Sequence, residues 1–284
     1  MAGIRTIGVI GAGTMGNGIA HVSARAGLRV LLYDVDNTAL YRGLDTIRAN
    51  MAREVAKQKL TVEEAEEARS RIVLTTSLDD LVPAELVIEA ATERFAVKSE
   101  IFRGLDRLLP AGAVLASNTS SISITKLAAV TKRPGQVIGM HFFNPVPVMQ
   151  LVEVIRGLQT TQETLDMVHA LAVRLGKTPV EVNDAAGFVS NRVLMPLINE
   201  AAYAVMEGVA TAEAVDKVFV LGMAHPMGPL TLADFIGLDV CVDIMRVLAE
   251  GLGDPKYNPC PLLVRMVDAG WLGRKSRRGF YTYS

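Results

Sequence analysis

The chain has 284 residues, a length that suits two domains or one large domain with a substantial core. Its 29 basic and 30 acidic side chains give a formal net charge of −1 with no basic tract, which gives nucleic-acid binding little support. Its two cysteines, Cys241 and Cys260, lack C-x-x-C spacing, which argues against a disulfide framework and a structural zinc site, and we expect no metal.

The N-terminal residues predict a strand, a glycine-rich loop, a helix and a second strand. The strand covers 6–10, the helix 17–26, and the second strand 28–33, which ends at Asp34. Between the first strand and the helix, Gly11-Ala12-Gly13-Thr14-Met15-Gly16 fits the pattern G-x-G-x-x-G. The pattern alone is weak evidence. Between a strand and a helix, with an acid after the next strand, it indicates a dinucleotide site.

Each part of this loop has a physical role in holding a cofactor. Gly11 allows the tight turn, Gly13 lets the backbone approach the pyrophosphate, and Gly16 lets helix and strand pack closely. The helix N-terminus offers N–H groups and a positive dipole end to phosphates. Asp34 would accept hydrogen bonds from ribose hydroxyls and repel a 2′-phosphate, so we expect NAD over NADP. FAD shares the fingerprint, and a tight turn in a cofactor-free α/β protein is the other alternative.

Residues 36–69 predict a helical hairpin, a long helix followed by a returning one. Thr61 and Glu64 form a plausible capping box for the second helix. Lys57 and Lys59 lie among apolar residues in the stretch 49–60. They either sit on a solvated surface or contact the phosphates of a substrate.

Apolar strands are predicted at 72–75, 86–88 and 113–116. After the second of them comes Glu93, then a helix over 96–109 with Lys98 in its first turn. A cation there opposes the helix dipole, which suggests a partner, either Glu93 or a ligand.

Five small polar residues, 117–121, follow the strand over 113–116. One of the serines could cap a helix near 124–129. The run also offers Asn118 and Ser120 to a ligand, because ligands bind at such strand ends in doubly wound sheets.

A histidine and a glutamate flank the next turn. His141, one of four histidines, follows the apolar pair 137–138, and Glu153 follows the apolar pair 151–152. Between them, Asn144-Pro145-Val146-Pro147 cannot continue a helix. A strand, a turn and a strand of this length can bring the two side chains together. An imidazole held by a carboxylate is a general base near neutral pH, although a structural His-Glu pair is also possible.

A helix over 165–175 and a strand over 179–182 end the alternation of strands and helices. Long helices are predicted over 187–206, with Asn191 near its start, and over 230–250, and His225 lies in a loop and is expected to be structural. The fold class is therefore α/β. A Rossmann-type doubly wound sheet forms a domain over 1–185, with the hairpin inserted near 36–69, and an all-helical domain follows over 186–284.

These motifs occur in order: the glycine loop with Asp34, Ser117-Asn118-Thr119-Ser120-Ser121, His141-Phe142-Phe143-Asn144-Pro145-Val146-Pro147, Leu151-Val152-Glu153, Gly187-Phe188 with Asn191-Arg192, and Pro226-Met227-Gly228-Pro229. Together they resemble the 3-hydroxyacyl-CoA dehydrogenase family over essentially the whole chain. The short, single-function bacterial 3-hydroxybutyryl-CoA dehydrogenases are the most similar in type. Fatty acid, butanoate, polyester and aromatic degradation routes all fit this resemblance.

The resemblance implies a role for each matched residue. His141 is the catalytic base and Glu153 its orienting partner, and Ser120 and Asn191 hold the substrate. An acyl-CoA, acetoacetyl-CoA or 3-hydroxybutyryl-CoA, is the implied substrate, with Lys57 and Lys59 as CoA contacts. NAD is held by the glycine loop and a set of further residues: Asp34, Glu93, Lys98, Asn118, Ser120, Asn144 and Lys275.

The sequence departs from the family near its end. The family often has a Lys-Thr-Gly-Arg-Gly-Phe stretch, whereas this chain has Lys275-Ser276-Arg277-Arg278-Gly279-Phe280. A non-glycine at 277 puts a cofactor role for Lys275 in doubt. Two other functions stay open: a dehydrogenase of the same fold acting on a sugar acid or other hydroxy acid without CoA, and a non-catalytic NAD-binding protein.

The mean hydropathy of +0.30 is high for a soluble protein, yet no run of about 18 uninterrupted apolar residues occurs. We therefore expect no membrane span, and apolar surface buried between subunits. Together with this apolar content, the family resemblance implies a homodimer that pairs through the helical domain. A strand pattern begins by Arg5, so no signal peptide is predicted and a cytoplasmic protein is expected.

Overall fold

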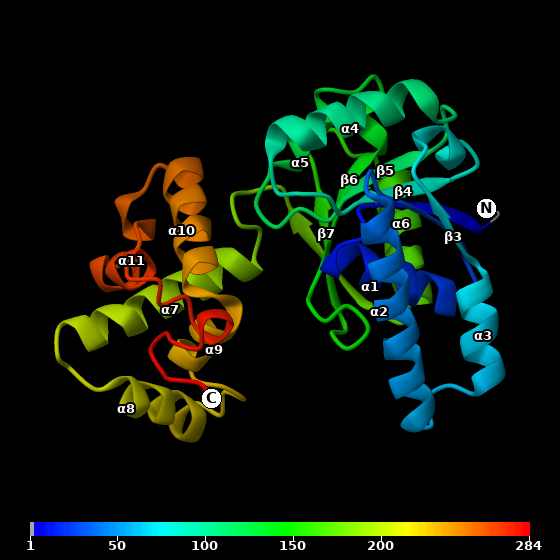
Figure 1. The fold of residues 1–284 in the computed structure, drawn as a ribbon. Helices are drawn as coiled ribbons and strands as arrows, with labels where there is room; N and C mark the ends of the chain where they lie inside the picture. The colour runs from blue at the N-terminus through cyan, green and yellow to red at the C-terminus, as the bar shows by residue number, and fades with distance from the viewer. Residues whose placement is uncertain (1–2) are drawn as a thin grey trace. The chain divides into compact units, whose positions relative to one another are not determined.

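The computed structural model describes residues 3–284, which divide into two compact units after Asp184. The first unit (Figure 1) contains eight strands and six α-helices among its described residues. The strands are β1 Thr6–Ile10, β2 Arg29–Tyr33, β3 Ile72–Thr75, β4 Leu86–Glu89, β5 Val114–Ser117, β6 Val137–Phe142, β7 Leu151–Arg156 and β8 Thr178–Asn183. The helices are α1 Thr14–Arg25, α2 Asn37–Ala56, α3 Val62–Ser70, α4 Phe95–Leu108, α5 Ile124–Ala128 and α6 Gln162–Arg174.

All eight strands form one sheet in the order β3-β2-β1-β4-β5-β6-β7-β8. Every pairing is parallel except that of β6 with β7. The strand order reverses at β1, which lies between β2 and β4, and this is the switch point at which doubly wound sheets bind ligands. The predicted α/β fold class is confirmed. β6 and β7 are antiparallel because only a short turn joins them, which leaves no length for a crossover helix.

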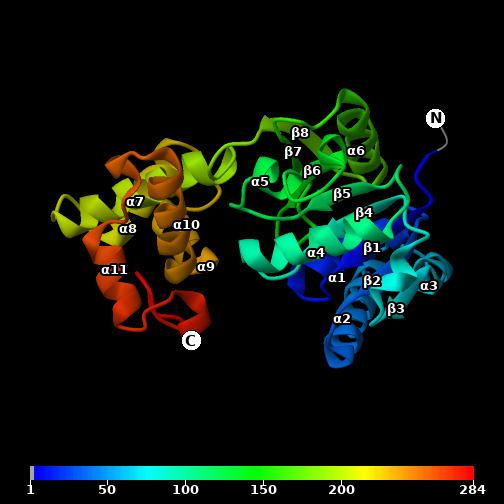
Figure 2. The ribbon, with the colours of Figure 1, turned by 90° about the horizontal axis from the view of Figure 1, so that it is seen from above.

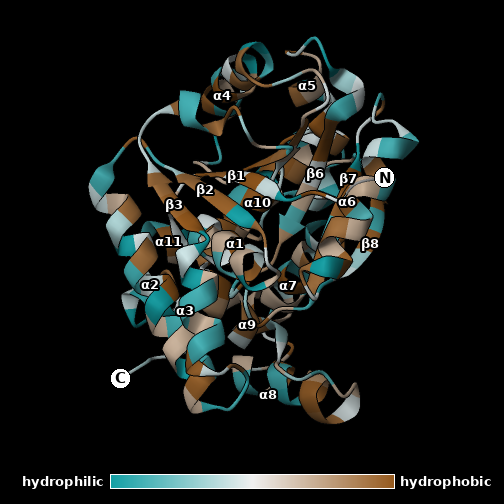
Figure 3. Ribbon diagram, turned by 90° about the vertical axis from the view of Figure 1, so that its right-hand side faces the viewer, coloured by the Kyte–Doolittle hydropathy of each residue, from teal (hydrophilic) through white to brown (hydrophobic). Residues whose placement is uncertain are grey.

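Helices cover both faces of the sheet (Figures 1 and 2). The apolar sides of α1, α2 and α6 share one buried cluster with one face of the sheet, while α4 and α5 lie over the other face. Strands covered on both sides are expected to be continuously apolar, and in Figure 3 β2 and β3 are brown while the outer surfaces of α2 and α3 carry teal. The carboxyl ends of the parallel strands present their side chains along one edge of this sheet.

The predicted helical hairpin corresponds to α2 and α3. The capping box at α3 is confirmed: the Thr61 side chain accepts a hydrogen bond from the Glu64 N–H, and the Glu64 carboxylate accepts one from the Thr61 N–H. At α5 the predicted cap is wrong, because Ser123, outside the 117–121 run, accepts the hydrogen bond from the Lys126 N–H.

The second unit is helical in the residues described. Its helices are α7 Ser190–Met206, α8 Ala212–Lys217, α9 Pro229–Ile236, α10 Leu238–Leu252 and α11 Pro261–Asp268. The prediction of a single helix over 230–250 is wrong. Gly237, which has φ +108°, separates α9 from α10. That backbone conformation suits glycine and cannot continue a helix. His225 packs edge-on against Phe219, with ring centroids 5.3 Å apart, which agrees with a structural role.

Over residues 3–284, no helix is both long and apolar enough to cross a membrane. Nor do these residues contain a cluster of three or more His, Cys, Asp or Glu side chains that could hold a metal ion.

Candidate active site

The glycine loop joins β1 to α1 at the switch point of the sheet. Gly11 has φ +94°, and a Cβ there would lie 2.7 Å from the Ala90 carbonyl oxygen. A Cβ on Gly16 would lie 1.7 Å from the Gly11 oxygen, so close packing of helix on loop requires glycine at both positions. Beside Gly13 the space is open within 4 Å. Gly13 is also the N-cap of α1, and it has no side chain that could accept a hydrogen bond from the first backbone N–H groups of the helix. These N–H groups can bind a pyrophosphate group instead.

Asp34, which directly follows β2, faces this loop. One carboxylate oxygen accepts a hydrogen bond from the Ala12 N–H at 2.8 Å, and the other from the Asp36 N–H at 3.0 Å. The side chain is half-buried. An acid fixed beside the glycine loop is placed where the ribose of a bound dinucleotide would lie, and its charge disfavours a 2′-phosphate there.

His141 and Glu153 face each other across the antiparallel β6–β7 pair. They are directly opposed in the strand register, and His141 Nδ1 lies 2.7 Å from Glu153 Oε2. The predicted pairing of the two side chains is therefore confirmed. His141 retains 8% of its exposure and Glu153 2%, so the carboxylate acts on the imidazole with little screening by water. The ring of Phe143 packs against the imidazole with centroids 4.6 Å apart.

The polar run after β5 lies at the strand end beside β6. The Asn118 side-chain oxygen accepts a hydrogen bond from the Phe142 N–H at 2.9 Å, which ties this run to the strand that carries His141. Because β5 and β6 are parallel neighbours, their ends place Ser120 and His141 at the same edge of the sheet.

Glu93 organises the same run from the loop after β4. Its Oε1 accepts hydrogen bonds from the backbone N–H groups of Ser120 and Ser121 at 2.9 and 3.0 Å, from their hydroxyls at 3.2 and 3.0 Å, and from the Thr119 hydroxyl at 2.6 Å. Burial raises the pKa of Glu93, but the charge of Lys98 and these hydrogen bonds outweigh it and lower the pKa below its usual value. Glu93 is therefore ionised near neutral pH and fixes the conformation around Ser120.

Lys98, in the first turn of α4, pairs with Glu93 as predicted, but a second carboxylate, that of Glu89, lies closer. Lys98 Nζ lies 2.8 and 2.9 Å from the two Glu89 oxygens and 3.4 Å from Glu93 Oε2. Glu89 also accepts hydrogen bonds from the Ser117 hydroxyl and the Ala91 N–H, both at 2.7 Å. Lys98 is 1% exposed and links the start of α4 to the end of β4, while Glu89 links β4 to β5 through Ser117.

Glu89 is the residue that the predicted site omitted. The available signal was an acid directly after the apolar run 86–88, at a strand end where a charge needs a partner. Choosing its partner requires the packing of α4 on β4, which no local pattern specifies.

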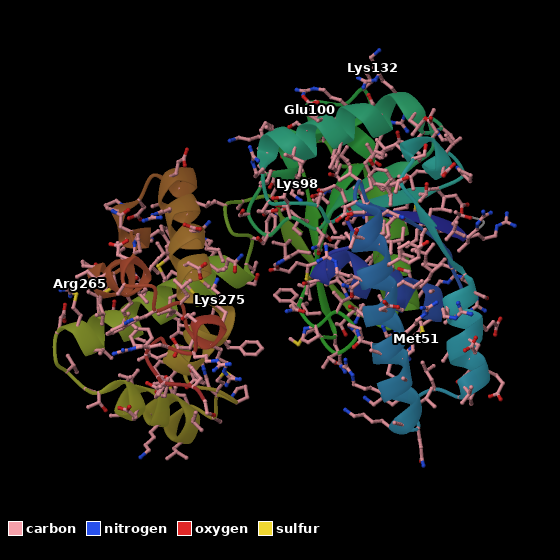
Figure 4. All side chains as sticks on the ribbon, in the orientation of Figure 1. Met51, Lys98, Glu100, Lys132, Arg265 and Lys275 are labelled. Atoms are coloured by element: carbon pink, nitrogen blue, oxygen red, sulfur yellow. The ribbon has the colours of Figure 1, made fainter. Side chains whose placement is uncertain are left out.

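The remaining predicted residues are Lys57, Lys59, Asn144, Asn191 and Lys275. Lys57 and Lys59 are exposed at the tip of the α2–α3 hairpin, and Asn144 is exposed in the β6–β7 turn, where its peptide bond to Pro145 is cis. Asn191 and Lys275 belong to the second unit, Asn191 buried near the start of α7 and Lys275 paired with Asp239 at 2.6 Å (Figure 4). Their roles toward substrate and cofactor stay predictions.

The departure in the C-terminal loop is visible in its backbone. Arg277 has φ +60°, so the chain adopts at this position a left-handed conformation for which glycine is normally favoured. The loop therefore keeps a glycine-like turn without a glycine.

Comparisons with known proteins cover nearly the whole chain. Residues 6–185 match the NAD-binding domain of 3-hydroxyacyl-CoA dehydrogenase, and residues 187–283 match its C-terminal domain. A probable 3-hydroxybutyryl-CoA dehydrogenase of Bacillus subtilis is 58% identical over 99% of this chain and 98% of its own length. A 3-hydroxybutyryl-CoA dehydrogenase of Bradyrhizobium diazoefficiens is 55% identical over 99% and 96%. The crystal structure of (S)-3-hydroxybutyryl-CoA dehydrogenase from Ralstonia eutropha aligns with a TM-score of 0.97 at 51% identity, over 99% of each chain.

Proposed function

The chain belongs to the 3-hydroxyacyl-CoA dehydrogenase family, and we propose how its own residues carry out the reaction. It is an NAD-dependent oxidoreductase that interconverts (S)-3-hydroxybutyryl-CoA and acetoacetyl-CoA. The observation that carries the proposal is the buried contact of 2.7 Å between His141 Nδ1 and Glu153 Oε2 at the carboxyl edge of the sheet. NAD, when bound, accepts or supplies the hydride at nicotinamide C4.

His141 moves the proton that accompanies the hydride. In oxidation the hydride leaves C3 of the substrate while His141 takes the proton of the hydroxyl group on that carbon, which leaves a carbonyl. In reduction the imidazolium returns the proton to the forming alkoxide. Because Nδ1 is bound to Glu153, the proton exchanged with the substrate is carried on Nε2. Glu153 stabilises the imidazolium that each oxidation creates.

Each predicted site residue is assigned to the substrate or to the cofactor in this proposal. The Ser120 hydroxyl and the Asn191 amide hold the substrate oxygen and the thioester, and Lys57 and Lys59 contact the phosphates of CoA. Asp34 and the loop 11–16 hold the adenosine half of NAD, while Glu93, Lys98, Asn118, Asn144 and Lys275 are assigned to the remainder of the cofactor site. Support for Ser120 comes from its position beside β6 and from the bonds that fix it to Glu93.

Loss of NADH absorbance with acetoacetyl-CoA tests the function, run beside NADPH and beside free acetoacetate. We expect turnover with NADH and the CoA ester. Turnover mainly with NADPH would overturn the role of Asp34 and leave the reaction in place. Turnover of free hydroxy or keto acids alone would favour the dehydrogenase of non-CoA substrates, and tight NADH binding without any turnover would favour the non-catalytic protein.

Replacing Glu153 with glutamine tests the carboxylate separately. Glutamine can still bond to Nδ1 but cannot stabilise an imidazolium by charge, so we expect kcat to fall by about 10- to 100-fold with little change in KM. The measurement is steady-state kinetics with acetoacetyl-CoA. Glu181→Gln, on the exposed side of neighbouring β8, is the matched control and should leave kcat at the wild-type value. A rise in KM alone would show that Glu153 contributes to binding rather than to proton transfer.

We also propose that the protein is a cytoplasmic homodimer that pairs through the second unit. Several large apolar side chains of that unit are exposed in the single chain, among them Leu221 at 82%, Val209 at 74% and Met223 at 56%. Exposed apolar surface of this kind is typical of subunit contacts. Light scattering should give twice the chain mass of 30.5 kDa, and a mass of one chain would contradict the dimer.

A further inference from the structure

The turn that joins β6 to β7, residues 143–150, is held from outside by Lys177. This lysine follows α6 and directly precedes β8, and the chain enters it through Gly176, which has φ +73°. Its Nζ donates hydrogen bonds to the carbonyl oxygens of Val146 and Met149, the latter at 2.8 Å. Two backbone acceptors three residues apart in one turn are thus fixed by a single cation.

Lys177 is an unusual residue to bury. It retains 8% of its exposure, and burial lowers the pKa of its ammonium, with a further lowering by Arg25 and an opposing effect of Glu54. Burying a charged ammonium is costly unless it is well hydrogen-bonded, and a charged donor makes stronger bonds than a neutral one. The two carbonyl contacts are therefore strong restraints on the turn.

The restrained turn lies against the proposed catalytic base. Phe143 is the first residue of the turn, and its ring packs on the His141 imidazole at 4.6 Å between centroids. Glu153 follows the last turn residue by three positions on β7. A displacement of the turn therefore moves the ring that packs on the imidazole and one end of the strand that carries its carboxylate.

The turn also packs against α1, the helix that follows the glycine loop. Val146 is buried, and a Cβ added to Gly18 of α1 would lie 2.7 Å from the Val146 Cβ. The Cβ atom is fixed to the backbone, so rotation of the Val146 side chain cannot relieve that contact. The turn is thus held both by its contact with α1 and by the ammonium of Lys177.

We propose that Lys177 is a positioning residue for His141: it holds the turn 143–150 in the conformation that orients the imidazole against Glu153. The inference rests on the proposed function, because the orientation matters to turnover only if His141 transfers the proton. Lys177 acts through the turn and touches neither substrate nor cofactor in this proposal.

Lys177→Met is the first test, because methionine keeps an unbranched apolar stem and removes the ammonium. We expect kcat for acetoacetyl-CoA reduction to fall by about 10- to 100-fold with the KM for acetoacetyl-CoA changed by less than about threefold, since displacing a catalytic group by about 1 Å costs on the order of 100-fold. Lys132→Met is the matched control. Its side chain extends from the surface in Figure 4, and kcat should stay at the wild-type value.

The decisive readout is the same substitution made in a His141→Gln background. If Lys177 acts through His141, Lys177→Met should lower the residual rate by less than about twofold there, because residues that act as a unit are not additive. An equal fold loss in both backgrounds would overturn the inference and leave the proposed function standing. Absence of acetoacetyl-CoA turnover by the wild-type protein would overturn the proposed function and this inference together.

Gly18→Ala keeps the inference testable if Lys177→Met does not fold. The added methyl group must displace the turn or α1, so we expect a lower kcat that is again not additive with His141→Gln, with the Kd for NADH measured separately. Gly104→Ala in α4, where a Cβ meets nothing within 4 Å, is the control. A wild-type kcat in Gly18→Ala would show that the position of the turn does not matter and would overturn the inference.

Discussion

Replacing His141 with glutamine is expected to lower kcat for acetoacetyl-CoA reduction by about 10²–10⁴-fold, the usual contribution of a positioned general acid–base group. Glutamine can donate a hydrogen bond to Glu153 and fill most of the space, but it cannot exchange a proton with the substrate. The Kd for NADH should change little, because the glycine loop and Asp34 lie at the ends of other strands. Steady-state rates and NADH fluorescence titration measure the two quantities.

His169→Gln is the matched control for this variant, since His169 is exposed on α6 and belongs to no proposed contact. Its kcat should equal that of the wild-type protein. Wild-type turnover in His141→Gln would refute the assignment of the base, whatever the cofactor preference.

The second large effect is expected on stability, at the buried ion pair behind the site. Glu89 is fully buried and Lys98 is 1% exposed, and their charged atoms lie 2.8 and 2.9 Å apart. Glu89→Leu leaves the ammonium buried, with the Glu93 carboxylate and the Ala91 carbonyl oxygen, both at 3.4 Å, as its neighbours in place of Glu89. We expect the free energy of unfolding of the first unit to fall by about 3–5 kcal/mol, the usual cost of removing one partner of a buried pair.

Urea denaturation followed by circular dichroism measures this loss. The only tryptophan, Trp271, lies in the second unit, so its fluorescence reports that unit and serves as an internal reference. Glu100→Leu, on the exposed side of α4 (Figure 4), should shift neither transition.

The double variant Glu89→Leu/Lys98→Met should recover most of the loss, because it removes the uncompensated charge and leaves apolar groups in its place. If Glu89→Leu lowers the free energy of unfolding by less than about 1 kcal/mol, the Glu89–Lys98 pair contributes no more than an exposed ion pair does. That result would contradict its structural role.

Much of the fold follows from local sequence. The glycine loop sits between β1 and α1 as predicted, because the tight turn at Gly11 and the close packing at Gly16 are requirements of a few adjacent residues. The pairing of His141 with Glu153 was also predictable. A short turn between two strands leaves few registers, and the apolar pairs before each residue indicate which positions belong to strands.

Other features depend on which elements become neighbours in space, and no local pattern could specify them. Lys98 reaches Glu89 because α4 packs over the end of β4, and Lys177 reaches the turn 143–150 because β8 pairs with β7. The break at Gly237 was invisible in the apolar composition around it, since both flanking helices are apolar. The sequence by itself therefore determined the fold class, the dinucleotide loop and the histidine–glutamate pair, whose geometry is set over short stretches of chain. Only the tertiary structure decided which buried charges hold these groups in place, because long-range packing selects those partners.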